Sequence, residues 1–341
     1  MVMDSGPLVS VVIPMYNAQK HLRECLESIL CQNYAHIEII AVDDGSTDLS
    51  PRICDDISSE DSRVRAIHQH NQGVACARNT GLGASKGEYV TFVDSDDWLE
   101  ADAIASLVSE AQVHDSDVVV GGYLRHIVGA DEREVTSKEL PGMGGGLLDT
   151  NVLSDPQCAR RVCDLDIAGH LYQCWGKLFR RPCINGLRFQ PGCSCGEDVV
   201  FVLDVLRRGV SISVLSKVLY NYREESGSLV RGFRMSKVND FEFNHGRHID
   251  FYKDLPITDD QRRAIDTRLA NDVLWAISAV RQAPDAISLK DRLHFIDQIS
   301  RSPWRDRYLH SLKAAHVDRL TKIAFLLNNG LLWRAYLKMG R

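Results

Sequence analysis

Short apolar segments alternate with segments of helical periodicity along the first 122 residues of the chain. The strand-like runs are residues 8–14, 37–43, 63–68, 88–94 and 117–122, and the helical runs are 18–32, 46–60, 73–85 and 101–112. Strands that alternate with helices form a mostly parallel sheet with helices on its faces, because each parallel connection has to cross the sheet. The sequence therefore predicts an α/β fold for this part of the chain.

The regular alternation stops after residue 122. Residues 123–155 contain the glycine-rich stretch PGMGGG (141–146), which predicts a mobile loop or a boundary. Further strand-like and helical runs follow in 156–230, and the patterns of 231–341 are mainly helical. We therefore expect two parts of one α/β domain, at 1–122 and 123–230, and a helical C-terminal region at 231–341.

Composition argues against several classes of protein. The net charge of −6 is opposite to the basic excess typical of a nucleic-acid binder. The ten cysteines include no C-x-x-C pair, which favours reduced thiols over a disulfide framework. The N-terminal MVMDSGPLVS lacks the pattern of a signal peptide, and no run approaches the about 20 apolar residues that cross a bilayer. We expect a cytoplasmic protein, with the inner face of the cell membrane as the alternative location.

Three of the predicted strands run into polar residues. These ends are Pro14-Met15-Tyr16-Asn17, Asp43-Asp44-Gly45-Ser46 and Asp94-Ser95-Asp96-Asp97. Ligands of parallel sheets bind at the carboxyl ends of the strands. Each end alone is compatible with a polar turn. Together, on one edge of one sheet, they predict a binding site.

Asp94 and Asp96 are two carboxylates at positions i and i+2 after a strand. Such a pair suits a hard cation, Mg²⁺ or Mn²⁺, that is held by one or two protein carboxylates and by phosphate oxygens of a ligand. The alternative is a solvated aspartate-rich turn, and a D-x-D pattern alone favours that turn.

The wider sequence context changes this balance. The blocks VSVVIPMYN, IEIIAVDDGSTD, NQGVACARNTGL and GEYVTFVDSDDWL occur in an order and at spacings that resemble the glycosyltransferase family 2 enzymes, which have the GT-A fold. The resemblance covers residues 8 to 122 closely and continues in weaker form to residue 230. It implies a Rossmann-like GT-A domain and a nucleoside-diphosphate-sugar donor, with UDP as the expected nucleotide and Mn²⁺ or Mg²⁺ as the cofactor. It does not identify the sugar.

The resemblance also implies roles for residues on the donor side. Pro14 and Tyr16 resemble the residues that hold the nucleobase, and Asp44, beside Asp43, resembles the acceptor for a uracil N–H. The alternative for the two aspartates is a turn that leads into a helix cap. Arg78 resembles a residue that contacts the base pocket or the phosphates, and its alternative is a solvated helix arginine.

The aspartate-rich turn completes the implied donor site. Asp94 is expected to contact the ribose or the metal, with Ser95 beside it, and Asp96 is expected to be the direct metal ligand. Asp97 is expected either to support this group or to cap the following turn. Arg223, after another strand-like run, is expected to reach the pyrophosphate, with a surface arginine as the alternative.

An acidic pair, Glu197-Asp198, opens an apolar helix that ends near Gly209. Acidic residues at a helix N-terminus are favourable in any protein, because they interact with the helix dipole. The resemblance assigns the pair to the acceptor side, with Asp198 as the general base and Glu197 as the substitute. One base and one displacement imply inversion at the anomeric carbon.

Trp175 and Lys177 match a tryptophan-and-lysine segment of the family, which places them on the acceptor side. Gly176 departs from the asparagine that is frequent in relatives, so the local acceptor contacts are in doubt. A sugar-stacking platform and a core tryptophan remain equal alternatives for Trp175.

The C-terminal segment from His316 to Arg341 combines large apolar residues with scattered basic ones. A basic amphipathic helix can lie on an anionic membrane surface. Packing within the chain or against a dimer partner is the alternative. Membrane contact would suit a lipid-linked glycan acceptor, whereas a free glycan acceptor does not require it.

Rival functions lack their motifs. The G-x-G-x-x-G turn of a dehydrogenase is replaced by PMYN after the first strand. A nucleotidyltransferase would carry a glycine-rich basic loop there, and an aspartyl-phosphate phosphatase would carry its D-x-D after the first strand. A degenerate transferase that acts as a non-catalytic carbohydrate-binding or scaffolding subunit remains the alternative. The intact Asp94, Asp96 and Asp198 argue against it.

Overall fold

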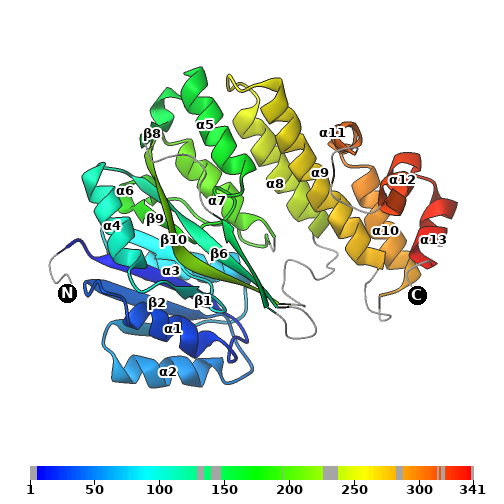
Figure 1. The fold of residues 1–341 in the computed structure, drawn as a ribbon. Coiled ribbons are helices and arrows are strands. Elements are labelled where there is room, and N and C mark those ends of the chain that lie inside the picture. The colour runs from blue at the N-terminus through cyan, green and yellow to red at the C-terminus, as the bar shows by residue number, and fades with distance from the viewer. Residues whose placement is uncertain are drawn as a thin grey trace. The chain divides into compact units, whose positions relative to one another are not determined.

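The computed structural model describes residues 6–128, 134–139, 147–193, 195–225, 237–281, 287–312, 315 and 319–338. The chain divides into two compact units, Met1–Glu225 and Ser226–Arg341. Figure 1 shows strands and helices in the first unit and helices in the second. The glycine-rich stretch 141–146 lies outside the described residues. The expected division at residue 122 remains a prediction.

The first unit is built on one mixed sheet. Its described strands are β1 (Val9–Met15), β2 (Ile37–Asp43), β3 (Val64–His68), β4 (Tyr89–Phe92), β5 (Trp98–Leu99), β6 (Val118–Val128), β7 (Glu134–Glu139), β8 (Leu147–Asp149), β9 (Lys177–Arg180) and β10 (Ser211–Glu225). They follow the order β3-β2-β1-β4-β9-β6-β10-β5, with β7 beside β6 and β8 beside β10. Strands β1 to β4 are mutually parallel, as the alternating pattern predicts.

Strand β9 runs against both of its neighbours. It pairs antiparallel with β4 on one side and with β6 on the other. Strand β6 in turn pairs parallel with β10 over a long register from Val118↔Ile212 to Val128↔Glu225. Because β9 is reversed, the loop that leads into it lies at the carboxyl end of β4 and beside Gly121 of β6.

Helices cover both faces of this sheet. The helices of the first unit are α1 (Leu22–Leu30), α2 (Ser50–Glu60), α3 (Val74–Ala84), α4 (Ala103–Val113), α5 (Pro156–Ile167), α6 (Arg181–Ile184) and α7 (Glu197–Leu206), with a 3₁₀ turn at Thr150–Val152. Each of the nine strands and helices predicted for the first 122 residues is present. The expectation of an α/β fold with GT-A architecture is confirmed.

The two faces of the sheet bury different side chains. One face packs Val11 and Ile13 of β1 against α1, α2 and α4 in a continuous apolar cluster. On the other face, Gly81 of α3 lies so close to Val12 that an added Cβ would meet Val12 Cγ1 at 2.4 Å. The alternation of β1 side chains thus fixes which helices lie on which side.

The second unit is helical, as its sequence predicts. Its described helices are α8 (Lys237–Tyr252), α9 (Asp259–Arg281), α10 (Leu289–Ser300), α11 (Arg305–Ser311), α12 (Arg319–Leu327) and α13 (Gly330–Lys338). The long α9 buries Ile265, Leu269, Val273, Ile277 and Val280, a stripe at helical spacing.

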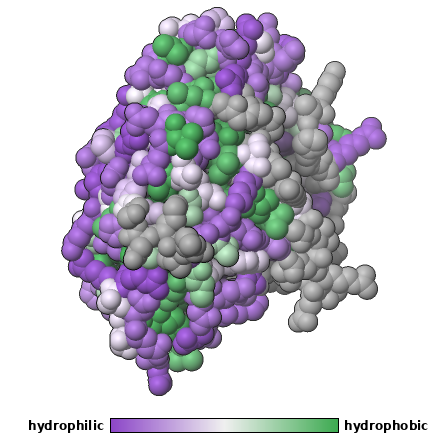
Figure 2. Space-filling model, turned by 60° about the vertical axis from the view of Figure 1, so that its left-hand side comes forward, coloured by the Kyte–Doolittle hydropathy of each residue, from purple (hydrophilic) through white to green (hydrophobic). Residues whose placement is uncertain are grey.

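The surface is mainly polar on the face that Figure 2 shows, where apolar side chains lie in small groups among hydrophilic ones. Within the described part of the chain, no helix combines the length and apolar character needed to span a bilayer. All ten cysteines lie in the described ranges, and none of them forms a disulfide.

Candidate active site

The three polar strand ends lie on one edge of the sheet. Met15 at the end of β1 pairs with Asp43 at the end of β2, and Val12 of β1 pairs with Phe92 at the end of β4. Each strand stops where polar residues begin, so these side chains leave the sheet at neighbouring positions. The three strand ends from which the site was predicted therefore share one edge of the sheet in the structure.

Asp44 anchors the loop between β3 and α3. Its buried carboxylate accepts hydrogen bonds from Gln69 Nε2 (2.7 Å), Gln72 N (2.9 Å) and Gly73 N (2.7 Å). Asp44 thus holds the loop that lies beside the carboxyl end of β2. Nearby, Pro14 is buried, whereas the ring of Tyr16 is 51% exposed and open to a ligand.

Asp43 contributes to a second cluster beside this wall. Its carboxylate accepts from Ser46 N (2.9 Å) and lies 3.0 Å from His68 Nδ1, while His68 Nε2 lies 3.0 Å from Asp55 Oδ1. The hydrogen bonds to Asp43 and Asp55 raise the pKa of His68 above its ordinary value. The imidazole therefore joins β2, β3 and α2 through its two ring nitrogens.

The Asp94–Asp97 segment forms a tight turn in which the carboxylates face different surroundings. Asp97 N donates to Asp94 O (3.1 Å), which closes the turn. The buried Asp97 carboxylate accepts from Tyr220 Oη (2.5 Å) and from Arg223 N (2.7 Å), both on β10. Asp96 is exposed. Asp97 therefore fixes the turn to β10, which decides between its two predicted roles in favour of support.

Burial raises the pKa of Asp97 well above its ordinary value, and the charges of Asp96 and Asp94 raise it further. Tyr220 holds the turn a second time, because its hydroxyl accepts from Asp94 N (3.1 Å). Sequence reasoning did not include Tyr220. Its position in an alternating strand indicates burial, but no pattern identifies its partners.

Arg223 holds the outside of the same turn. Its Nε donates to Asp96 O (3.0 Å), its Nη2 lies 2.7 Å from Glu24 Oε2, and its guanidinium lies 4.7 Å from the ring centre of Trp98. The side chain thus connects the turn to α1. Contact with a pyrophosphate remains a prediction for this residue.

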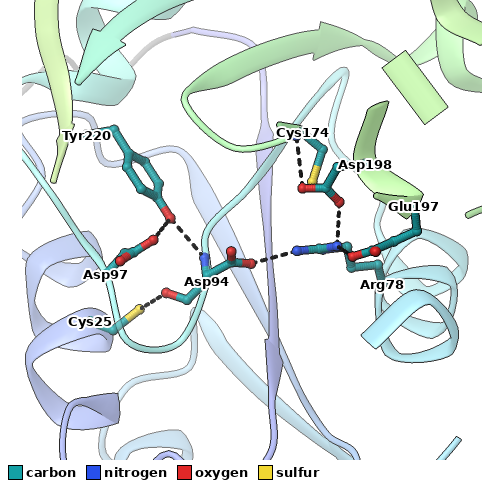
Figure 3. A network of polar contacts seen from close by, with 8 residues as sticks. All are labelled: Cys25, Arg78, Asp94, Asp97, Cys174, Glu197, Asp198 and Tyr220. Atoms are coloured by element: carbon teal, nitrogen blue, oxygen red, sulfur yellow. Dashed lines mark hydrogen bonds and ion pairs between the residues drawn. The ribbon is translucent and has the colours of Figure 1, made fainter. Parts of the chain in front are cut away.

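Arg78 connects the two ends of the predicted site. Its side chain is 3% exposed, and it pairs with Asp94 Oδ1 (2.8 Å), Glu197 Oε1 (2.6 Å) and Asp198 Oδ1 (2.5 Å). Figure 3 shows the guanidinium between Asp94 on one side and the acidic pair on the other. The Asp94–Asp97 turn and the Glu197–Asp198 pair, distant in sequence, therefore belong to one ion-pair network. The alternative of a solvated helix arginine does not apply.

Glu197 and Asp198 lie in the first turn of α7, after Gly196 in the left-handed region at φ 81°. Asp198 Oδ2 also accepts from Cys174 N (3.3 Å), in the loop that leads into β9. Burial raises the pKa of both carboxyl groups; that of Glu197 reaches about 7, with the charge of Asp198 as a further cause, while Arg78 opposes the rise in each. The pair therefore includes a carboxyl group that exchanges a proton near neutral pH.

Four phenylalanines position α7. Phe201 of α7 stacks on Phe189 at 4.1 Å between ring centres and meets Phe92 of β4 and Phe179 of β9 edge-on at 5.9 Å each. Aromatic pairs of this kind are rigid and well packed. They hold the first turn of α7, and thus the acidic pair, over the end of β4.

Trp175 and Lys177 are buried next to the edge of the sheet that forms the candidate site. Trp175 is 5% exposed and stacks on Tyr220 (4.4 Å between ring centres) and Tyr222 (5.3 Å). Lys177 is 2% exposed, its Nζ lies 3.4 Å from Trp175 O, and burial lowers its pKa to about 8. Their acceptor role remains a prediction; in this structure Trp175 packs as a core residue that supports Tyr220.

Comparison with known proteins identifies the family. The model for "Glycosyl transferase family 2" matches residues 10–184. The chain belongs to glycosyltransferase family 2. The resemblance expected from the four sequence blocks is thereby confirmed.

Two relatives within the family show how far the similarity extends. The chain is 36% identical over 234 residues to glycosyltransferase GlyA of Streptococcus pneumoniae, covering 65% of this chain and 31% of GlyA. It is 34% identical over 225 residues to the uncharacterised glycosyltransferase EpsJ of Bacillus subtilis, covering 65% of this chain and 63% of EpsJ. The matched region spans less than two thirds of either relative.

Solved structures share the fold. S. aureus TarS 1-349, in complex with UDP-GlcNAc, aligns with a TM-score of 0.62 at 18% identity, covering 97% of this chain and 90% of that one. Mannosyltransferase PcManGT from Pyrobaculum calidifontis, in complex with GDP-Man and Mn²⁺, aligns with a TM-score of 0.54 at 16% identity, covering 96% and 88%.

The carboxylates at this edge of the sheet suit a metal ion that binds together with a diphosphate ligand. No group of three or more His, Cys, Asp or Glu side chains arranged for a metal occurs within the described ranges. Asp94 and Asp96 offer two carboxylates, and Arg78 takes only Oδ1 of Asp94. Mg²⁺ and Mn²⁺ sites often use one or two carboxylates and fill the remaining positions with phosphate oxygens and water. These residues therefore suit a metal–diphosphate complex rather than a metal bound by protein alone.

Proposed function

We propose that the chain is an inverting, metal-dependent glycosyltransferase that moves a sugar from a UDP-sugar to a hydroxyl group of a glycan or lipid-linked glycan. The observation that carries this proposal is the Arg78 network, in which one guanidinium pairs with Asp94, Glu197 and Asp198. A donor held at the Asp94–Asp96 turn would present its sugar to the acidic pair at the start of α7.

The residues at the end of the site that is expected to hold the sugar donor support a nucleotide as the ligand. The exposed ring of Tyr16 offers a face for stacking, and Asp44 has an acceptor position on Oδ2 beyond the bond from Gly73 N. TarS and PcManGT, which share the fold, are described in complex with UDP-GlcNAc and with GDP-Man and Mn²⁺. We propose UDP because a carboxylate acceptor at this position suits the uracil N–H.

In the proposed reaction, the acceptor oxygen attacks the anomeric carbon from the face opposite the diphosphate. The bond between that carbon and the phosphate oxygen breaks, its electron pair leaves with UDP, and the new glycosidic bond forms with inversion. When bound with the diphosphate, Mn²⁺ or Mg²⁺ supplies charge neutralisation of the leaving group. Asp94 and Asp96 are the residues that would hold the ion.

Asp198 is the proposed general base, which takes the proton of the acceptor hydroxyl. A base is most effective when its pKa lies near the working pH, because it must be ionised and still be strong. Burial raises the pKa of Asp198, and Arg78 and Cys174 N orient its carboxylate. Glu197, whose pKa is about 7, is the substitute base.

The proposal is tested first by binding. In calorimetry with UDP and Mn²⁺, Asp96→Ala should abolish the metal-dependent part of binding. Asp115→Ala is the matched control, because Asp115 is an exposed aspartate of the same unit that pairs with Arg180. Tight metal-dependent UDP binding by Asp96→Ala would remove Asp96 as the ligand.

Turnover separates an enzyme from a binding subunit. Wild-type chain should hydrolyse one member of a panel of UDP-, GDP- and dTDP-sugars, whereas Asp198→Asn should bind UDP normally and lose most turnover. An unchanged rate in Asp198→Asn would place the base elsewhere. Absence of turnover with every donor, despite UDP binding, would favour the non-catalytic alternative.

A further inference from the structure

The last two described helices of the second unit expose large apolar side chains that are not buried in the core of that unit. In α12 and α13, the side chains of Leu320, Ile323, Leu326, Leu327, Leu331 and Leu332 are between 40% and 78% exposed. We call these six residues the apolar tip, because four of them surround the Asn328–Gly330 turn that joins the two helices.

The opposite faces of the same helices hold them in the unit. Phe325 is buried in α12, and Trp333 and Tyr336 are buried in α13. Trp333 Nε1 donates to Asn328 Oδ1 (3.1 Å), and the hydroxyls of Thr321 and Tyr336 lie 2.6 Å apart. The helices thus have a second apolar face, which is directed away from their core.

All charged residues of α12 and α13 are basic. Residues 319–338 contain Arg319, Lys322, Arg334 and Lys338 and no aspartate or glutamate. On neighbouring α10, Asp297 lines the same hollow as Arg334, but its carboxylate is paired with Arg301 (3.0 Å). The surface that carries the exposed leucines is therefore cationic.

We propose that the apolar tip docks on an anionic lipid surface. Exposed leucines flanked by lysine and arginine suit the boundary between acyl chains and anionic headgroups, where the apolar side chains enter and the basic ones stay at headgroup level. The polar Asn328–Gly330 turn limits the depth to this interface. The inference does not depend on the proposed reaction.

A second copy of the chain fits this surface less well. In a symmetric dimer the same patch lies on both partners, so the four basic residues would meet like charges. An anionic surface instead supplies the opposite charge that the patch lacks.

The proposal is tested by flotation of the full chain with vesicles. Wild type should float with phosphatidylcholine vesicles that contain phosphatidylglycerol, not with pure phosphatidylcholine, and binding should weaken at high salt. Leu327→Glu with Leu331→Glu should abolish flotation. The matched control is Val113→Glu with Leu289→Glu, which makes the same exchange at two exposed apolar positions outside the tip and should float as wild type does.

A charge variant gives a second, milder measurement. Arg319→Gln with Lys338→Gln should weaken partition into anionic vesicles about twenty-fivefold, from about fivefold for each charge. Donor hydrolysis and circular dichroism verify that each variant is folded. Absence of wild-type flotation, or equal loss in the control pair, overturns the proposal. A wild-type dimer that Leu327→Glu with Leu331→Glu dissociates would assign the tip to a second copy instead.

Discussion

Replacement of Arg78 by methionine tests the central feature of the site. The guanidinium is 3% exposed and pairs with Asp94, Glu197 and Asp198, whose side chains are 27%, 9% and 15% exposed. Methionine keeps much of the volume and contact with Phe189, but it leaves three carboxylates without their cation. Removing one partner of a buried ion pair costs about 3–5 kcal/mol, and we expect a loss of that size in the free energy of unfolding.

The loss should depend on pH in a defined direction. Arg78 lowers the pKa values of Glu197 and Asp198 against the effect of burial, so its removal raises both further. Protonation then relieves the uncompensated charge. The deficit of Arg78→Met should therefore be largest above pH 7 and should shrink as the pH falls toward 5, in proportion to the protons that the pair takes up.

Urea titration measures this effect, with hydrogen–deuterium exchange of peptides from β4 and α7 to report on the first unit alone. Arg63→Met is the matched control, because Arg63 pairs with Asp61 at 2.7 Å but both side chains are about 30% exposed. Surface pairs of this kind contribute about 0–1 kcal/mol. A loss below about 1 kcal/mol in Arg78→Met, or one that does not change with pH, would refute the reasoning.

Three further predictions concern neighbouring features. The pKa of Glu197 is about 7 in the folded chain, against an ordinary value of 4.5. Between these two pH values the folded state holds a proton that the unfolded state has lost, so the free energy of unfolding falls as the pH rises, by about 1.4 kcal/mol per pH unit. In urea titrations, Glu197→Gln should flatten this slope. Tyr220→Phe removes the hydroxyl that donates a hydrogen bond to the buried Asp97, and it should lower the free energy of unfolding by about 1–3 kcal/mol. It should also raise the KM for the nucleotide sugar and the metal more than it changes kcat. In thermal unfolding, Gly81→Ala should destabilise the chain, because its Cβ would overlap Val12, whereas Gly83→Ala in the same helix meets nothing within 4 Å and should stabilise it by up to about 1 kcal/mol.

Each of these has a result that contradicts it. An unchanged pH slope in Glu197→Gln would assign the titration to another group. Tyr222→Phe is the control for Tyr220→Phe, since both rings stack on Trp175, and equal effects of the two would deny a special role for the Tyr220 hydroxyl. Equal melting temperatures of the two glycine variants would mean that β1 can shift at Val12 to accommodate the added methyl group without a loss of stability.

Local patterns predicted the strands and helices of the first 122 residues well. The apolar run 37–43 coincides with β2, and the run 8–14 is displaced from β1 by one residue, because a buried parallel strand is a continuous apolar segment bounded by turn residues. The same patterns could not give the direction of β9. Its four residues do not show whether they run parallel or antiparallel to β4 and β6, since helices would cover both faces of the strand in either direction.

The site shows the same limit at the level of single residues. Asp96 and Asp97 are adjacent and chemically identical, yet one is exposed and the other is buried against Tyr220, because the turn alone decides which side chain faces β10. Arg78 was predicted to meet the ligand, and its partners at the start of α7 are 119 and 120 residues away in the sequence. No local pattern reports contacts over that separation.

The reversed strand β9 has a consequence for how such a protein can diversify. Cys174, in the loop that leads into β9, donates its backbone N–H to Asp198, whereas β1 and β2, at whose carboxyl end Asp44 lies, keep their register without that loop. Insertions or deletions in this loop would therefore change the surroundings of Asp198 and leave the Asp44 end of the edge in place. Under the proposed function, a library varied only in this loop should change the preference for the acceptor and leave nucleotide binding at the Asp44 end unchanged.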